Sequence, residues 1–186
     1  DVPVAVELFV AGRRSHERQP AAPRLVELGF VAGKPGEAKH PAFLVATSAA
    51  EAGVDLDADH AICDLVAWER MVQRLGRVNR RGLGDATVVV VPGRAEDDEE
   101  TRARQEAVLE VLHKLPSTGD RALDGSPAAL SKLRSDPSAR AAIERASTPA
   151  PLHPPLTRAV VDAWAMTSLE LHPGRPEVAP WIRAWP

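Results

Sequence analysis

Residues 43–82, FLVATSAAEAGVDLDADHAICDLVAWERMVQRLGRVNRRG, decide the fold of this chain. The apolar run at residues 43–46, between Pro41 and Thr47, predicts a short buried strand. A second strand is predicted at residues 60–66 and a helix at residues 68–75. The loop between the strands carries small, acidic and hydroxyl side chains, which open α/β sheets display beyond their strand ends, where ligands bind. We therefore expect an α/β fold with a site at this loop.

The predicted helix has two different faces. Its apolar residues recur at offsets i, i+3, i+4 and i+7, which is typical of a stripe that packs on a core: Trp68, Met71, Val72 and Leu75. Gln73, Arg77 and Arg80 follow the spacing i, i+4, i+7 and point roughly opposite that stripe. If the helix ends near Gly76, the two arginines emerge together from its end.

Two permanently charged, planar guanidiniums suit a phosphate that gains charge during transfer. A second interpretation stays open, because arginines at a helix end often form surface ion pairs only. Their partners would then be Asp55, Asp57 or Asp59.

Two sequence motifs in this stretch resemble those of a known family. Residues 73–80, QRLGRVNR, resemble motif VI (QRxGRxxR) of superfamily 2 helicases, and residues 45–56 resemble their motif V. The motifs occur in the right order, separated by one predicted strand. The ending GRVNRRG, together with Glu51 and residues 55–59, more closely resembles the helicase-nuclease that degrades DNA in type I CRISPR systems. Residues outside 43–82 resemble this family only loosely.

This resemblance implies a fold and a nucleotide site. The fold would be RecA-like α/β, a mostly parallel sheet with flanking helices, plus a partly helical C-terminal extension. Such motors hold ATP and Mg²⁺ between two RecA-like domains, and the first domain supplies most of the metal site. Arg77 and Arg80 would be arginine fingers, and Gln73 would orient a phosphate or the attacking water. Gly53 would let backbone approach the nucleotide, and Asp55 would bind the ribose or brace a finger.

The same resemblance implies a nucleic-acid track. Thr47 would donate a hydrogen bond to a phosphate of the bound strand, with Ser48 beside it. Arg74 would be a structural or DNA-facing partner. Arg13 and Arg14 follow the strand predicted at residues 3–10, where these helicases approach the nucleic-acid backbone, although a solvated basic turn is an equally good interpretation. Without the resemblance, Thr47 and Asp55 would be explained as helix caps or loop hydrogen-bonders.

The implied domain organisation is that of part of a longer protein. Residues 1–93 would form the second RecA-like domain, incomplete at its N-terminus, and residues 94–186 a helical and proline-rich extension or linker. The partners would be the first RecA-like domain and a nuclease domain of the same protein, single-stranded DNA and a crRNA-guided surveillance complex. The six histidines show no short ligand spacing, so a nuclease metal would be bound outside this chain.

Composition limits the alternatives. A net charge of -3 excludes a strongly basic nucleic-acid coat, so any such contact should be a narrow track. The single cysteine, Cys63, rules out an internal disulfide framework and favours a reducing cytoplasm. No apolar run approaches the ~18 residues of a membrane span.

The flanking sequence predicts further elements. A third strand is expected at residues 85–91, then a helix opened by the acidic residues 95–100 and closed by Pro116. Residues 117–155 should hold loops and short helices, best placed at 128–133 and 138–146, and Thr157 should cap another helix. The prolines of residues 171–185 predict no regular structure there. Periodicity does not decide between helix and strand for residues 23–30.

Two other functions remain compatible with the sequence. One is an RNA helicase or a DNA-repair helicase of the same superfamily. The other is a non-enzymatic module that kept the fold in order to bind protein or nucleic acid.

Overall fold

The computed structural model describes residues 3–10, 21–34, 40–51, 55–93, 98–119, 122–149, 154–166 and 175–183. The chain forms two compact units, Asp1–Thr148 and Pro149–Pro186. Residues 98–148 belong to the first of these compact units, and the domain boundary expected near residue 93 stays a prediction. No helix within the described residues has the length and apolar content needed to cross a bilayer.

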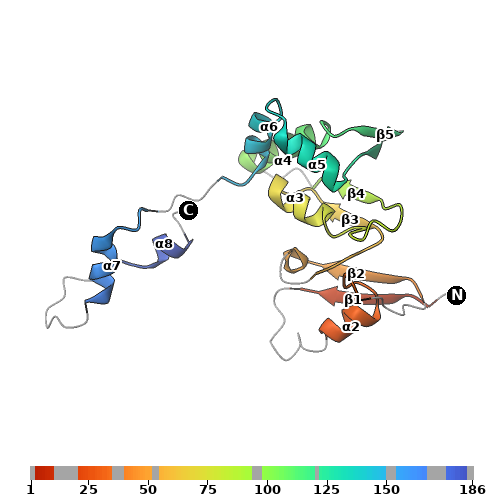
Figure 1. The fold of residues 1–186 in the computed structure, drawn as a ribbon, viewed down its shortest axis with the longest axis horizontal. Coiled ribbons are helices and arrows are strands. Elements are labelled where there is room, and N and C mark those ends of the chain that lie inside the picture. Colours follow the sequence, from red (N-terminus) through yellow and green to blue (C-terminus); the bar gives the residue numbers. More distant parts are fainter. Residues whose placement is uncertain are drawn as a thin grey trace. The chain divides into compact units, whose positions relative to one another are not determined.

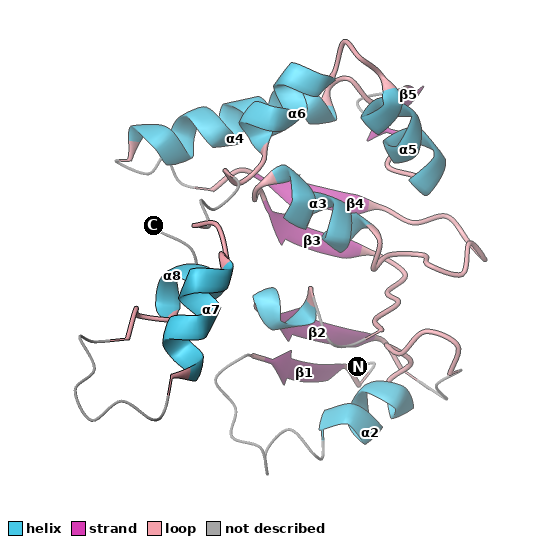
Figure 2. Cartoon of the chain, turned by 60° about the vertical axis from the view of Figure 1, so that its left-hand side comes forward, coloured by secondary structure: helices cyan, strands magenta, loops and turns pink. Residues whose placement is uncertain are grey.

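Four parallel strands in two pairs form the centre of the first unit. Strand β1 (Ala5–Phe9) pairs with β2 (Ala42–Ala46), and β3 (Ala61–Asp64) pairs with β4 (Val88–Val91). Both views show them following one another in the order β1, β2, β3, β4 (Figures 1 and 2). These four strands form two separate two-stranded sheets instead of one. The expected parallel α/β arrangement is confirmed, and it is consistent with a RecA-like fold.

Helices flank the strand pairs. Helix α2 (Ala21–Glu27) lies beside β1 and buries Leu25, so the segment that periodicity left undecided is a helix (Figure 1). Helix α3 (Trp68–Leu75) lies against β3 and β4 in both views. Its apolar stripe is confirmed, because Trp68 and Met71 are buried and Val72 packs against the same cluster. The short 3-10 helix η1 (Ser48–Ala50) follows β2 directly.

The main core of the first unit lies between α3 and the helices after residue 93. Helix α4 (Glu99–Leu112) begins at the cap residue Asp98, whose side chain accepts hydrogen bonds from the backbone of Glu100 and Thr101. Val108, Val111 and Leu115 are buried in one cluster with Met71. Helices α5 (Pro127–Ser135) and α6 (Arg140–Ala146) complete the cluster, and α6 lies along α4 in Figure 2.

Three details of the sequence-based prediction are wrong. Strands β5 (Ser117–Gly119) and β6 (Ala122–Leu123) pair antiparallel, where only loops and short helices were expected. Strand β4 begins at Val88 instead of Asp85. Residues 179–183 form helix α8 despite the prolines nearby. Pro180 sits in the first turn of α8, where a missing backbone N–H costs nothing.

The second unit consists of α7 (Arg158–Ala165) and α8 (Ala179–Arg183). The predicted cap of α7 is confirmed, because the Thr157 side chain accepts a hydrogen bond from the Val160 N–H. The rings of Trp164 and Trp181 meet edge to face, with centroids 5.2 Å apart. The Trp164 indole N–H also donates to the Pro176 carbonyl at 2.8 Å.

Candidate functional site

The predicted site begins at the carboxyl end of β2. The Thr47 N–H donates to the Phe9 carbonyl, so β1 and β2 stay paired up to this residue. The Thr47 side chain is exposed and makes no capping bond to η1, and Ser48 is exposed too. Helix capping therefore does not account for Thr47. Its hydroxyl lies at the strand end, at a position from which it can reach a bound ligand.

Glu51, directly after η1, joins this loop to α3. Its carboxylate accepts two hydrogen bonds from Arg70, through Nε and Nη2 at 2.8 Å each, and one from Arg74 Nε at 2.9 Å. Only 9% of the Glu51 side chain is exposed. The hydrogen-bonded Arg70 guanidinium holds the pKa of Glu51 below its ordinary value, with Arg74 adding to the effect. The carboxylate is therefore ionised at neutral pH.

Arg74 extends the same network to the end of β3. Its Nη1 donates to the Asp64 carboxylate at 2.6 Å and to the Asp64 carbonyl at 2.9 Å. Arg74 was predicted as a structural or DNA-facing residue. These contacts favour the structural role, because 17% of its side chain is exposed and its guanidinium is shared between two carboxylates.

The two arginines predicted as fingers converge on one carboxylate. Arg80 Nη1 lies 2.7 Å from Asp55 Oδ1, and Arg77 Nη1 lies 3.6 Å from the same oxygen. Arg77 Nη2 also donates to the Glu51 carbonyl at 2.8 Å. Helix α3 ends at Leu75 with Gly76 as its cap, as expected, so both arginines lie in the turn that follows. Asp55 and Arg80 are about half exposed, which leaves this pair open to solvent.

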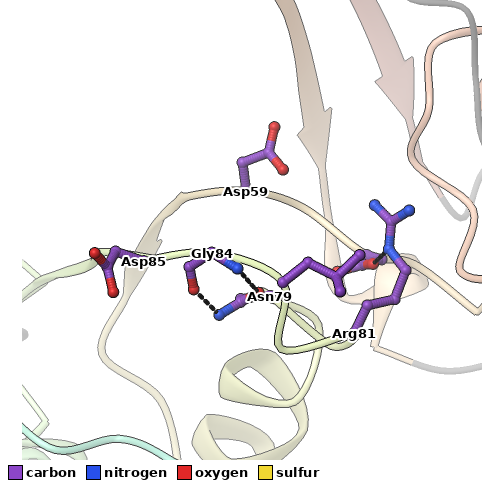
Figure 3. Close-up of a pocket in the computed structure, with 7 residues that line it drawn as sticks. Asp59, Asn79, Arg81, Gly84 and Asp85 are labelled. Atoms are coloured by element: carbon purple, nitrogen blue, oxygen red, sulfur yellow. Dashed lines mark hydrogen bonds and ion pairs between the residues drawn. The ribbon is translucent and has the colours of Figure 1, made fainter.

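A second carboxylate organises the turn after α3. Asp57 is buried, and its oxygens accept hydrogen bonds from the Arg80 N–H at 2.8 Å and from Arg81 Nε at 2.6 Å. Asn79 adopts a positive φ of 46° and exchanges two hydrogen bonds with the backbone of Gly84 (Figure 3). The turn that carries Arg77 and Arg80 is therefore held by Asp57 and by the hydrogen bonds between Asn79 and Gly84.

A small pocket opens beside this turn (Figure 3). It is lined by Asp57, Asp59, Asn79, Arg81, Leu83, Gly84 and Asp85. Three carboxylates and one guanidinium give its wall a net negative charge, which does not suit a phosphate. Within the described residues, the guanidiniums at Asp55 offer the better place for an anion.

The remaining predicted residues are placed as follows. Gln73 lies on α3 with an exposed side chain and is not part of the arginine cluster. Gly53, Arg13 and Arg14 lie outside the residues that the structure describes. The described residues contain no group of three or more possible metal ligands.

Sequence reasoning missed the residues that hold the arginines in place. Arg70 was not singled out, and Glu51 was noted only as part of the resemblance. One signal was present, since Arg70, Arg74 and Arg77 are spaced i, i+4, i+7 and so share one face of the helix. Such a basic stripe needs an acidic partner when it is half-buried, and Glu51 supplies it.

The fold defines the class of this protein as an α/β lobe of the RecA-like kind. Residues 4–83 match the family model of the CRISPR-associated nuclease/helicase Cas3, C-terminal. This match covers less than half of the chain, and it includes both motifs and the arginine cluster. Residues 4–83 are thus similar to the C-terminal segment of that nuclease/helicase family, and the resemblance seen in the motifs is confirmed.

Solved structures of T. fusca Cas3 share this fold. The structure described as Cas3-ATP has a TM-score of 0.51 at 21% identity, covering 72% of this chain and 17% of that one. A second structure of T. fusca Cas3 has a TM-score of 0.50 at 21% identity, covering 69% and 16%. The chain thus spans about one sixth of the length of these proteins. No curated protein matches the sequence.

Proposed function

We propose that this chain supplies the second motor lobe of an ATP-dependent DNA helicase or translocase of the Cas3 kind. Its full-length protein would unwind and degrade target DNA after recruitment by a crRNA-guided complex. The observation that carries the proposal is the convergence of Arg77 and Arg80 on one Asp55 oxygen, next to the loop that bears Thr47.

The convergence matters because it brings two cations to a single anionic oxygen. Arg80 and Arg77 lie 2.7 and 3.6 Å from Asp55 Oδ1, so the two guanidiniums can share one oxygen ligand. An oxygen of a phosphate offers the same kind of acceptor. The donor set therefore fits a nucleotide phosphate, provided that Asp55 shifts or shares its partners.

ATP, when bound by the whole protein, would supply the phosphoryl group whose transfer releases the energy for movement. In this chain, Arg77 and Arg80 hold positive charge at the phosphate position, and Asp55 keeps both side chains oriented towards it. Gln73 would orient a phosphate or water from the exposed face of α3. Gly53 would let backbone come close to the nucleotide. We assign Mg²⁺ mainly to the first RecA-like domain and any nuclease metal to a separate domain.

The nucleic-acid contacts form the second part of the proposal. Thr47 and Ser48 would bind the phosphate backbone of a single strand, because both are exposed at a strand end and Thr47 is not used as a cap. Arg13 and Arg14 would extend this track. Arg74 would support these nucleic-acid contacts indirectly, through its hydrogen bonds to Glu51 and Asp64.

The surface ion-pair interpretation remains the competitor, because Asp55 pairs with both arginines in the structure. The two ideas differ in what removal of an arginine does to turnover. A surface pair contributes ~0–1 kcal/mol to stability and nothing to catalysis. A finger contributes ~10³ to 10⁵ in rate.

The test uses the full-length protein and measures ATPase activity with single-stranded DNA and with RNA. We expect Arg77→Ala and Arg80→Ala each to lower the stimulated rate by at least ~10³. Arg140→Ala is the matched control, because Arg140 is 82% exposed on α6 and pairs with Glu144 one turn away. Wild-type rates in both finger variants would refute the proposed role. Stimulation by RNA but not by DNA would favour an RNA helicase instead.

A further inference from the structure

We propose that Glu51 is a positioning residue that couples the nucleic-acid loop after β2 to the arginines of the motor site. This inference rests on the proposed function, because it gives Arg77 the role of a finger. Glu51 itself would touch neither ATP nor nucleic acid. It would set where Arg77 lies.

The first argument is the number of contacts that one residue makes. The Glu51 carboxylate accepts three hydrogen bonds from Arg70 and Arg74, at 2.8, 2.8 and 2.9 Å. Its backbone carbonyl accepts a fourth from Arg77 Nη2 at 2.8 Å. The stripe Arg70, Arg74 and Arg77, which runs along α3 and into the turn after it, is thus held by a single residue of the preceding loop.

The second argument concerns where the Glu51 backbone is fixed. The Glu51 N–H donates to Ser48 O and the Ala50 N–H donates to Thr47 O, both at 3.0 Å. One 3-10 turn therefore separates the exposed hydroxyls of Thr47 and Ser48 from the carbonyl that holds Arg77. A shift of this loop on binding a strand would move that carbonyl too, since this hydrogen-bonded turn joins them.

The third argument is electrostatic. Arg70 and Arg74 are one helical turn apart, so their like charges repel unless an anion lies between them. Glu51 supplies this anion with 9% of its side chain exposed, and its carboxylate remains ionised because the arginines lower its pKa. Neutralising Glu51 would leave the half-buried guanidiniums of Arg70 and Arg74 without their shared anion. The hydrogen bonds that join the loop to α3 would be weakened as a result.

The fourth argument is the link to the sheet. Arg74 also binds the carboxylate and the carbonyl of Asp64 at the end of β3. The Glu51 network therefore ties together the ends of β2 and β3 and one face of α3. The network lies at the carboxyl ends of parallel strands, where α/β folds bind their ligands, although most of its side chains are partly buried.

The experiment compares Glu51→Gln with wild type in the full-length protein. We expect kcat of the DNA-stimulated ATPase to fall by about 10²-fold, as for a misplaced reacting group, while KM for ATP and the affinity for single-stranded DNA stay within error. Glu51→Asp keeps the charge and should recover part of kcat. Glu100→Gln is the matched control, because it breaks an exposed glutamate–arginine pair on α4.

A purely structural role predicts a different pattern. In that case the active fraction and the melting temperature fall together, and kcat per folded molecule stays at the wild-type value, which would overturn the inference. If Glu51→Gln does not fold, Arg70→Lys is the deciding variant. It keeps the positive charge and removes the bidentate hydrogen bonding to the Glu51 carboxylate. Arg70→Lys should then lower kcat with KM unchanged, and a wild-type kcat would refute the coupling.

The outcome separates this inference from the proposed function. Full activity in Arg77→Ala would refute the finger itself and remove the basis of both. Loss of activity in Arg77→Ala with wild-type kcat in Glu51→Gln would refute only the coupling. The double variant should lose no more than Arg77→Ala alone, because Glu51 would act through Arg77.

Discussion

Glu51 shows how a single ionised side chain can make a stripe of arginines compatible with partial burial. Three arginines at i, i+4 and i+7 would repel one another on an isolated helix. Here the carboxylate lies between Arg70 and Arg74, and the carbonyl of the same residue receives Arg77. Glu51 thus contacts all three arginines from outside the helix, while Asp64 and Asp55 provide further carboxylates for Arg74 and Arg77.

This arrangement predicts a specific dependence of stability on pH. The pKa of Glu51 in the folded chain lies below its ordinary value of 4.5, chiefly because of the hydrogen bonds from Arg70. A group with a lowered folded pKa stabilises the fold above its unfolded pKa, and this contribution is lost as the pH falls through the folded value. The difference in free energy of unfolding between wild type and Glu51→Gln should therefore be constant above about pH 5 and shrink below pH 4.5.

The measurement is denaturant unfolding of both proteins between pH 7 and pH 3. Glu27→Gln serves as the control, since its carboxylate is 66% exposed beside Arg24 and its loss should cost less than about 0.5 kcal/mol at any pH. A wild-type advantage that does not decrease in acid would contradict the role assigned to the Glu51 carboxylate.

At the scale of elements, α3 has to serve both the core and the site. Met71 is fully buried against α4, while Arg70 and Arg74 on neighbouring faces bind the loop after β2. We expect Met71→Ala to lower the free energy of unfolding by about 2–5 kcal/mol, because it leaves a cavity in the packed cluster. Chemical denaturation checks this value. Lys132→Ala on α5 is the control and should change it by less than about 0.5 kcal/mol.

The turn after α3 allows a sharper comparison. Asn79 has a φ of 46°, a conformation that costs an ordinary L-residue roughly 1–2 kcal/mol and glycine almost nothing. Both Asn79→Gly and Asn79→Ala remove the hydrogen bonds to Gly84. Asn79→Ala should therefore be less stable than Asn79→Gly by about 1 kcal/mol. Equal stabilities in thermal unfolding would show that the turn relaxes to another conformation.

Sequence patterns predicted those helices that carry clear local signals. The stripe of Trp68 and Met71, the acidic first turn of α4 and the cap at Thr157 are all local, and the structure contains each of them. Strand pairing is not local, so the split into two pairs and the antiparallel pair β5–β6 could not be derived.

The site was predictable only in part, for a related reason. The motifs predicted that Arg77 and Arg80 lie together, and the structure confirms that they share Asp55. Their supports come from distant loops, and no local pattern reveals them. Glu51 lies 19 residues before Arg70 in the sequence, yet the two are hydrogen-bonded.

At the scale of the first unit, one face of the β1–β2 pair is apolar and exposed. Strand residues alternate, and the outward set contains Val6, Leu8, Phe43 and Val45, each at least 46% exposed. Parallel sheets are normally covered on both faces, so an exposed apolar face of this kind favours dye binding and self-association. We expect this chain, expressed alone, to bind an apolar fluorescent dye and to scatter light at high concentration.

The double variant Val6→Thr and Val45→Thr tests this expectation. Both side chains lie on the exposed face, so dye binding should decrease while stability changes by less than about 0.5 kcal/mol per site. Leu156→Thr is the control, because Leu156 is exposed outside the strands. Unchanged dye binding in the double variant would show that other surfaces are responsible.

The last residue of the first unit is hydrogen-bonded to α3. At the last residue of this unit, the Thr148 hydroxyl donates to Glu69 Oε1 at 2.5 Å and its N–H to Glu69 Oε2 at 3.3 Å. Glu69 lies in the first turn of α3, at the opposite end from Arg77. A pull on the polypeptide beyond residue 148 therefore acts on this carboxylate as well as on the backbone that leads back to α6, so part of the tension enters α3 at the end opposite to Arg77.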